Sequence, residues 1–261
     1  MFFNQNIFYI KFKNVKKAKA NIIFTHGLGE NTQDYNHIAK YFNSLHYNIL
    51  LYDVRGHGKS GGKRGNIKNF HILVEDLKYI VNFIKQKNNL KIFLMGHNSM
   101  GGIIVNSYLV KYKDIDGAII SASPILINKK NKYLQYPFYF FNFFKKKKIN
   151  FSSKNICSIP LEEGYYPYRL NFVTLRLLRN LLFLNLIYLQ NKIHLYSANV
   201  LFLYSIQDKI VSHKNIDYFF NKIMSKDKTL YFYQKSFHNL FHDIEKEKVL
   251  EDIFIWLEKR I

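Results

Sequence analysis

Lys91-Ile92-Phe93-Leu94-Met95-Gly96-His97-Asn98-Ser99-Met100-Gly101-Gly102 is the stretch that decides the fold of this 261-residue chain. It opens with a mostly apolar run typical of a short buried strand, and residues 103–110 after it show the apolar spacing of a helix. A strand that turns sharply through glycine into a helix is the backbone that lifts a serine nucleophile above a sheet. We therefore expect Ser99 to lie at a nucleophile elbow.

Asn98 departs from the usual elbow motif, G-x-S-x-G, because two residues instead of one separate Gly96 from Ser99. With Ser99 as the nucleophile, His97 lies two residues before it, at a position that takes a small residue in the usual motif. We then expect the His97 ring to crowd the following helix. With Asn98 in the nucleophile slot, an amide replaces the nucleophile and Met100 falls where glycine belongs. We favour the first register, in which the strand end absorbs the extra residue as a bulge. The alternative is a retained fold with lost catalysis.

The composition limits the class of protein. With 48% hydrophobic residues, the chain can bury a substantial core in one domain, which we expect to span residues 1–261. The single cysteine, Cys157, cannot form an intrachain disulfide, which fits a reducing compartment. No apolar run approaches the ~20 residues of a membrane span, and residues 1–19 lack the pattern of a cleaved signal. We expect a cytoplasmic protein, with peripheral membrane contact as an option.

The formal net charge of +21 has two interpretations. Codon bias in an AT-rich genome enriches lysine, asparagine, isoleucine, tyrosine and phenylalanine, and would give a basic chain without functional meaning. The alternative is attraction to an anionic partner. Residues 126–195 carry nine lysines and three arginines against two glutamates, and include the aromatic run 136–144. This concentration favours an anionic membrane over nucleic acid, for which no recognised module is present.

Apolar strands alternate with amphipathic helices along the chain, which indicates a mostly parallel sheet covered by helices on both faces. We expect two strands within residues 5–17 and further strands at 21–25, 47–52, 91–95, 117–121, 200–204 and 229–233. The expected helices are 32–45, 70–87, 100–112, 213–224 and 245–259. Residues 124–195 break the alternation and form an insertion between two core strands, with helical spacing from Leu170 to Leu189.

A serine nucleophile needs an imidazole to take its proton and a carboxylate to orient that imidazole. In α/β-hydrolases the order along the chain is serine, acid, histidine. Asp208 ends the apolar run 199–207, and His238 follows the strand 229–233 after a short loop. Carboxyl ends of parallel strands meet at one sheet edge, where sites form. Order and placement together make Ser99, Asp208 and His238 the candidate triad.

The chain resembles the monoacylglycerol lipase and lysophospholipase branch of the α/β-hydrolase superfamily, which is grouped with the S33 serine aminopeptidases. The resemblance runs from about Asn21 to Ile261 and is weakest across the insertion. Five segments carry it, namely the histidine–glycine loop Thr25–Glu30, the D-x-R-G-H-G-x-S turn Asp53–Ser60, the back of the elbow Ser99–Gly102, the acid loop Gln207–Val211 and the histidine segment His238–Asp243.

The resemblance implies an α/β-hydrolase fold with a cap at about 124–195, and it implies a role for each site residue. Ser99 attacks the acyl carbonyl, His238 acts as general base and then as general acid, and Asp208 holds the imidazole. The backbone N–H groups of Leu28 and Met100 form the oxyanion hole. His242 and Asp243 are expected on the first turn of the next helix, supporting the loop.

The implied activity is hydrolysis of carboxylic esters of single-chain lipids, a monoacylglycerol or a lysophospholipid, through an acyl-enzyme. No metal or organic cofactor is implied, and the cap would shape the acyl channel and contact the membrane. The alternative from another class is a non-catalytic lipid-binding or scaffold protein on the same fold, which Asn98 keeps open. Residues 56–61 also satisfy G-x-G-x-x-G, but the next helix begins only near Phe70, which argues against nucleotide binding.

Overall fold

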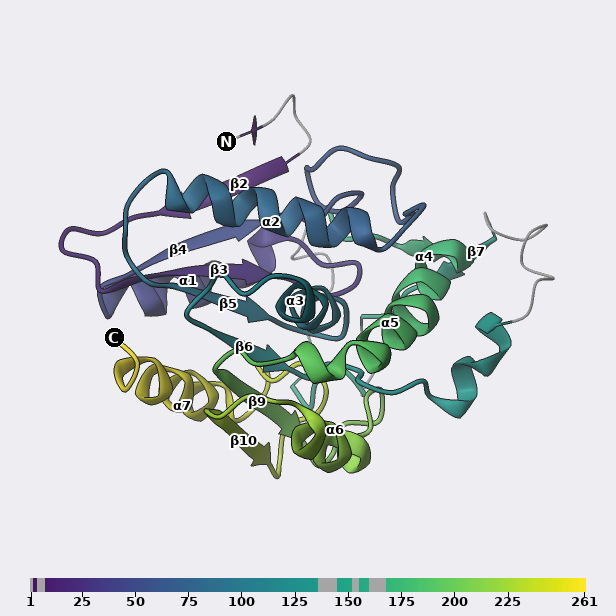
Figure 1. The fold of residues 1–261 in the computed structure, drawn as a ribbon. Helices are drawn as coiled ribbons and strands as arrows, with labels where there is room; N and C mark the ends of the chain where they lie inside the picture. The colour runs from purple at the N-terminus through teal and green to yellow at the C-terminus, as the bar shows by residue number, and fades with distance from the viewer. Residues whose placement is uncertain (1, 4–7, 136–144, 152–154, 160–167) are drawn as a thin grey trace.

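A computed structural model describes residues 2–3, 8–135, 145–151, 155–159 and 168–261 of the chain. Eight strands form its central sheet, in the order β1-β2-β4-β3-β5-β6-β9-β10 (Figure 1). β1 and β2 are antiparallel to their neighbours and the remaining pairs are parallel, so the expected mostly parallel sheet is confirmed. The strands are β1 Phe2–Phe3, β2 Phe8–Lys13, β3 Ala20–Thr25, β4 Tyr47–Tyr52, β5 Ile92–Gly96, β6 Gly117–Ser121, β9 Val200–Ser205 and β10 Lys228–Tyr233.

Helices cover both faces of the sheet (Figure 1). Helices α1 (Asn36–Ser44) and α7 (Lys246–Glu258) contribute to the core on one face. Helices α2 (His71–Lys85), α3 (Met100–Lys111) and α6 (Ile216–Lys222) contribute to the core on the other. Every residue of β3, β4, β5, β6 and β9 is buried, which explains why these strands are continuous or nearly continuous apolar runs instead of alternating patterns.

The predicted helices and strands of the core are found within a few residues of their expected bounds, with three differences. Residues 32–45 and 213–224 each begin with a 3₁₀ turn, Thr32–Tyr35 and His213–Asn215, before the α-helix starts. Of the two strands expected within residues 5–17, the described residues contain β2 alone, and residues 4–7 lie outside the described part.

The third difference lies in the insertion, where the helical spacing expected from Leu170 to Leu189 is wrong for its first residues, because the helix begins only at Leu175. Phe172–Thr174 form a strand, β8, which pairs antiparallel with β7 (Lys146–Lys148). The Thr174 side chain then accepts a hydrogen bond from Leu177 N–H and caps the helix that follows. That helix runs through α4 (Leu175–Arg179), a π-helical turn (Asn180–Leu184) and α5 (Asn185–Asn191). The insertion also contains 3₁₀ segments at Lys129–Gln135 and Ile193–Leu195.

Hydrogen bonds and an ion pair attach the insertion to the core loops. Leu170 N–H donates to the Gly29 carbonyl at 2.8 Å, and Thr174 N–H donates to the Gly65 carbonyl at 2.8 Å. The Arg169 guanidinium pairs with Asp34 at 3.0 Å. The insertion therefore lies against the loops that follow the strands. Its aromatic run 136–144 falls outside the described residues. Within the described residues no helix combines the length and hydropathy of a membrane span.

Candidate active site

The elbow keeps glycine at the crossing of strand and helix. Gly96, the last residue of β5, is in regular parallel register with Thr25 of β3 and Ile120 of β6. A Cβ atom added to Gly96 would lie 2.5 Å from the Gly101 carbonyl oxygen, and one added to Gly101 would overlap the Thr25 carbonyl oxygen. The expectation that His97 crowds α3 is therefore wrong. The expected bulge is wrong as well, since β5 pairs regularly on both sides up to Gly96.

The extra residue is accommodated in the turn between β5 and α3. Asn98 and Ser99 are both left-handed, with φ of +46° and +60°. Asparagine tolerates this region better than most residues, whereas serine adopts it only where the surroundings hold it. Ser99 N–H donates to the Ala122 carbonyl at 3.0 Å, and the Ser99 carbonyl accepts from Ile103 N–H at 2.9 Å. These two bonds fix a strained backbone at the candidate nucleophile.

The His97 side chain turns away from α3 and toward the loop that carries His238. Its Nε2 atom lies 2.9 Å from Oδ1 of Asn239, and its ring stacks on Phe241 with centroids 4.0 Å apart. Complete burial lowers the pKa of His97 well below its ordinary value, so the ring is neutral. His97 thus joins the elbow to the histidine loop as an uncharged packing group.

Asn98 contacts the histidine–glycine loop, residues 25–30. Its Nδ2 group donates to Oε1 of Glu30 at 2.7 Å, and Oε2 of Glu30 accepts from Gly27 N–H at 2.8 Å and from the Tyr35 hydroxyl at 2.5 Å. A Cβ atom on Gly27 would overlap Asn98, so glycine is required at that position. Our sequence reasoning did not single out Glu30 as a site residue, and its only signal was its place at the end of the matched loop.

Asp208 and His238 form a hydrogen-bonded pair at the carboxyl edge of the sheet. Asp208 follows β9 and His238 follows β10, and Nδ1 of His238 lies 2.7 Å from Oδ2 of Asp208. The other carboxylate oxygen accepts from Ile210 N–H at 2.8 Å and from Val211 N–H at 2.9 Å. Because the carboxylate accepts the Nδ1 proton, the unprotonated nitrogen of a neutral His238 is Nε2. The pair is therefore oriented for Nε2 to act as a base.

The pKa of His238 reflects two opposing influences. Burial alone lowers the pKa, because it disfavours the charged imidazolium. The charge and hydrogen bond of Asp208, assisted by the charge of Glu30, act in the other direction and leave the pKa of His238 above its ordinary value. The Asp208 carboxylate thus stabilises the protonated ring, as a general base requires.

The loop around His238 is held by two carboxylates that precede α7. Asp243 accepts from Phe237 N–H at 2.7 Å, and Glu245 accepts from Ser236 N–H at 2.8 Å. His242 and Asp243 lie in the turn before α7, which begins at Lys246, so their expected position on its first turn is wrong. Burial lowers the pKa of His242 to about 3, and its Nε2 lies 2.8 Å from the Asp34 carbonyl oxygen. His242 is therefore a neutral support, and its ring packs against Tyr35 and His37.

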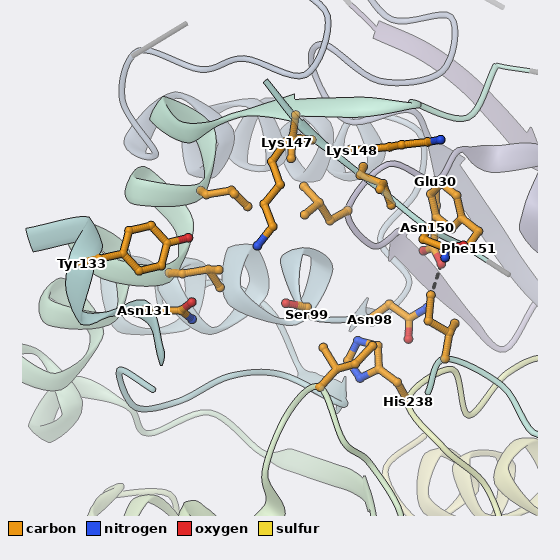
Figure 2. Close-up of a pocket in the computed structure, with 17 residues that line it drawn as sticks. Glu30, Asn98, Ser99, Asn131, Tyr133, Lys147, Lys148, Asn150, Phe151 and His238 are labelled. Atoms are coloured by element: carbon orange, nitrogen blue, oxygen red, sulfur yellow. Dashed lines mark hydrogen bonds between the residues drawn. The ribbon is translucent and has the colours of Figure 1, made fainter. Parts of the chain in front are cut away.

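Ser99 and His238 line the same cavity, which has a volume of about 270 Å³ (Figure 2). Figure 2 shows the Ser99 hydroxyl directed into the cavity and away from the His238 ring. Both residues are described, and no hydrogen bond joins them in this structure. The fold thus brings Asp208 and His238 into direct contact and places Ser99 at the shared cavity.

Leu28 and Met100, the expected oxyanion donors, flank the same region. Leu28 lines the cavity from the turn Gly27–Glu30, which a bond from Glu30 N–H to the Gly27 carbonyl closes at 3.3 Å. Met100 is the first residue of α3, where an N–H group has no acceptor within the helix. The Leu28 donor therefore lies on a loop that lines the same cavity as Ser99, and the Met100 donor lies at the start of α3, directly after Ser99 in the chain.

The cavity wall is mainly apolar, with a few polar side chains. The apolar side chains are Leu28, Ile149, Phe151, Ile156, Val173, Leu178, Leu182 and Ile210. Asn131, Tyr133 and Lys147 from the insertion add polar groups that our sequence reasoning did not identify. No group of three or more His, Cys, Asp or Glu side chains that could hold a metal ion occurs within the described ranges. The chemistry available is that of a serine, a histidine and a carboxylate beside an apolar cavity.

A sequence profile of the serine aminopeptidase S33 family matches residues 16–245 of this chain. Among curated proteins, human monoglyceride lipase is 22% identical over 98% of this chain and 88% of its own length. The monoacylglycerol lipase of Mycolicibacterium smegmatis is 33% identical over 40% of this chain and 37% of its own length.

Two solved structures share the fold. The monoacylglycerol lipase of Paleococcus ferrophilus superposes with a TM-score of 0.82 at 23% identity, covering 97% of this chain and 99% of that one. A soluble variant of monoglyceride lipase from Saccharomyces cerevisiae, in complex with a substrate analogue, also superposes with a TM-score of 0.82 at 23% identity. This superposition covers 97% of this chain and 91% of that one. The expected α/β-hydrolase fold is confirmed.

Proposed function

The chain belongs to the serine aminopeptidase S33 family, and on that basis we propose that it hydrolyses carboxylic esters of single-chain lipids, a monoacylglycerol or a lysophospholipid. The observation that carries the proposal is the Asp208–His238 pair, joined at 2.7 Å beside an apolar cavity that Ser99 also lines. Relatives named monoglyceride lipase along almost the whole chain support the substrate class.

In the proposed reaction, the Ser99 hydroxyl attacks the ester carbonyl and Nε2 of His238 takes its proton. The N–H groups of Leu28 and Met100 stabilise the oxyanion, at about 3–4 kcal/mol per donor. The acyl–oxygen bond breaks, the alcohol leaves with the proton from His238, and an acyl-enzyme remains on Ser99. Water, activated by the same imidazole, then releases the fatty acid and regenerates the serine.

The Ser99 hydroxyl must first turn toward His238, because the two side chains are not hydrogen-bonded in this structure. Catalytic hydrogen bonds are often long or poorly aligned without substrate and tighten once it binds. An ester seated in the cavity would bring its carbonyl between Ser99 and the donors of Leu28 and Met100. We therefore assign the rotation of Ser99 to substrate binding.

Labelling with a fluorophosphonate tests the proposal, because only an activated serine reacts with this probe. We expect covalent labelling at Ser99, found by mass spectrometry, together with fatty acid release from a monoacylglycerol or a lysophospholipid. Heat-denatured protein serves as the control for nonspecific labelling. A folded protein that neither reacts with the probe nor hydrolyses either lipid would contradict the proposal.

A non-catalytic lipid-binding protein is the second candidate, and one observation favours it. The extra Asn98 makes two consecutive turn residues left-handed, and the Ser99 hydroxyl points away from His238. Such a protein would bind a non-hydrolysable ether lipid and leave the fluorophosphonate unreacted. Binding by calorimetry and labelling by mass spectrometry therefore distinguish the two candidates.

The raised pKa of His238 predicts the acid limb of the pH–rate profile. The imidazole must be neutral to accept the serine proton, so kcat/KM should fall as the pH drops through a pKa above the ordinary value of about 6.5. Asp208→Asn removes the charge that raises this pKa and leaves burial dominant. The variant should be slower, and its acid limb should lie at lower pH. Profiles of p-nitrophenyl ester hydrolysis between about pH 5 and 9 measure the shift. An acid limb unmoved by Asp208→Asn would contradict this role for Asp208.

A further inference from the structure

One wall of the cavity carries a lysine directed inward. Lys146, Lys147 and Lys148 form β7, so their side chains alternate between its two sides. The Lys146 ammonium lies 4.0 Å from the centroid of the Phe172 ring. Figure 2 shows the Lys147 side chain extending into the cavity toward the side where the Ser99 hydroxyl points, whereas the Lys148 amine points away from it. Lys147 therefore brings a positive charge into the site itself.

No carboxylate within the described residues pairs with Lys147. Of the cavity-lining residues that the structure describes, Glu30 alone is acidic, and both of its oxygens are already bonded, to Asn98, Gly27 and Tyr35. A cation beside apolar walls is less well hydrated than one on an open surface, so it gains more from a bound anion. Among the described residues, the positive charge of Lys147 in the cavity is thus not balanced by a paired carboxylate.

Two neutral polar side chains lie on the same side of the cavity as the Lys147 amine. Asn131 and Tyr133 come from the 3₁₀ segment Lys129–Gln135. In Figure 2 the Tyr133 hydroxyl and the Asn131 amide lie on the side of the cavity that contains the Lys147 amine and the Ser99 hydroxyl. Phosphate oxygens accept hydrogen bonds, and an ammonium, a hydroxyl and an amide N–H can each donate one. The remaining wall is mainly apolar and suits an acyl chain.

From this arrangement we propose that Lys147, assisted by Asn131 and Tyr133, binds a phosphate on the alcohol part of the lipid ester. The preferred substrate is then a lysophospholipid with an anionic headgroup, and a neutral monoacylglycerol is the poorer one. This inference rests on the proposed ester hydrolysis at Ser99. Only the acyl–oxygen bond breaks: the phosphorylated alcohol leaves with a proton from His238, water completes the fatty acid, and the phosphate ester stays intact.

The test compares a monoacylglycerol with its 3-phosphate, both with the same short acyl chain and both below their micelle concentrations. Without a lipid surface, any discrimination arises in the cavity. Lys147→Met should lower the ratio of kcat/KM for the phosphate ester over the neutral ester about 10–100-fold, mainly through KM, because a hydrogen bond to a charged group is removed. Lys147→Arg should keep most of the preference. Lys146→Met, on the same strand with its ammonium over Phe172, is the matched control and should leave the ratio unchanged.

A binding measurement separates this inference from catalysis. Non-hydrolysable ether analogues of the two lipids are titrated into the Ser99→Ala protein by calorimetry, with inorganic phosphate as a third ligand. Tighter binding of the phosphate analogue than of the neutral one, with the difference lost in Lys147→Met, supports the inference. This holds even if the native protein hydrolyses neither ester, because that result contradicts only the proposed function.

Three calorimetric results would overturn the inference that Lys147 binds the phosphate. The first is equal affinity for the two analogues, and the second is an equal loss of affinity for both analogues in Lys147→Met. The third is inorganic phosphate binding as tightly as the phosphate analogue. An effect of Lys147→Met seen only with anionic vesicles would also overturn it, since Lys147 would then contact the membrane and not the substrate.

Discussion

Ester hydrolysis is expected to fall about 10³–10⁶-fold when Ser99 or His238 is replaced by alanine. Ser99→Ala removes the atom that attacks the carbonyl, and His238→Ala removes the base that lies 2.7 Å from Asp208. Residues that act as one catalytic unit are not additive, so the double variant should be about as slow as either single variant. Asp208→Ala should cost less, because the imidazole remains.

His242→Ala is the matched control, since His242 is a partly buried histidine on the same loop and is bonded to Asn239 and to the Asp34 carbonyl. We expect it to retain most of the activity, after circular dichroism and thermal unfolding show that each variant is folded. Steady-state kinetics on p-nitrophenyl esters and on a monoacylglycerol measure the losses. Unchanged hydrolysis by Ser99→Ala, or equal losses for His238→Ala and His242→Ala, would refute the assignment.

Deletion of Asn98 is expected to raise the rate about 100-fold, since a displacement of about 1 Å at the reacting atom has an effect of this size. The deletion leaves three residues between Gly96 and Gly101 in place of four, which restores the G-x-S-x-G spacing. Both glycines stay at the crossing where a Cβ would not fit. Ser99 would then be the only residue of the shortened turn required to be left-handed, and its hydroxyl would be carried toward His238.

Asn98→Gly is the control for the deletion, because it keeps the length of the turn and removes only the side chain bonded to Glu30. Glycine adopts the left-handed region without cost, so this variant should fold. The rate of fluorophosphonate labelling and kcat/KM are measured for both variants. If the deletion is slower than the native protein and the native protein reacts fully, the longer turn is a working elbow. If Asn98→Gly gains as much as the deletion, the side chain and not the length limits the rate.

Local pattern was enough to predict the core of this protein. Helical and strand periodicities arise from the backbone within each element, and fully buried parallel strands such as β4 and β6 appear as short apolar runs with recognisable ends. The proximity of Asp208 to His238 also followed from the sequence, because both residues follow parallel strands whose carboxyl ends meet at one edge. The proximity of Asp208 and His238 was thus predictable from their order in the chain and their place after parallel strands.

The accommodation of Asn98 depended on tertiary structure. Whether β5 bulges or its turn lengthens is decided by the two neighbouring strands, which hold Gly96 in register with Thr25 and Ile120. The extra residue therefore moved into the turn, where Asn98 found Glu30 as a partner. The direction of the Ser99 hydroxyl follows from that turn, and no local pattern encodes it.

The insertion shows the same limit for side chains that reach the site from far along the chain. Its helical spacing predicted α4 and α5, because a helix is stabilised by contacts only a few residues apart. The pairing of β7 with β8 joins residues 146–148 to residues 172–174, and that pairing decides which lysine of a uniform lysine run faces the cavity. Four consecutive lysines are indistinguishable in sequence. Only the register of a strand, set by a distant partner, directs the Lys147 side chain into the cavity that Ser99 also lines (Figure 2).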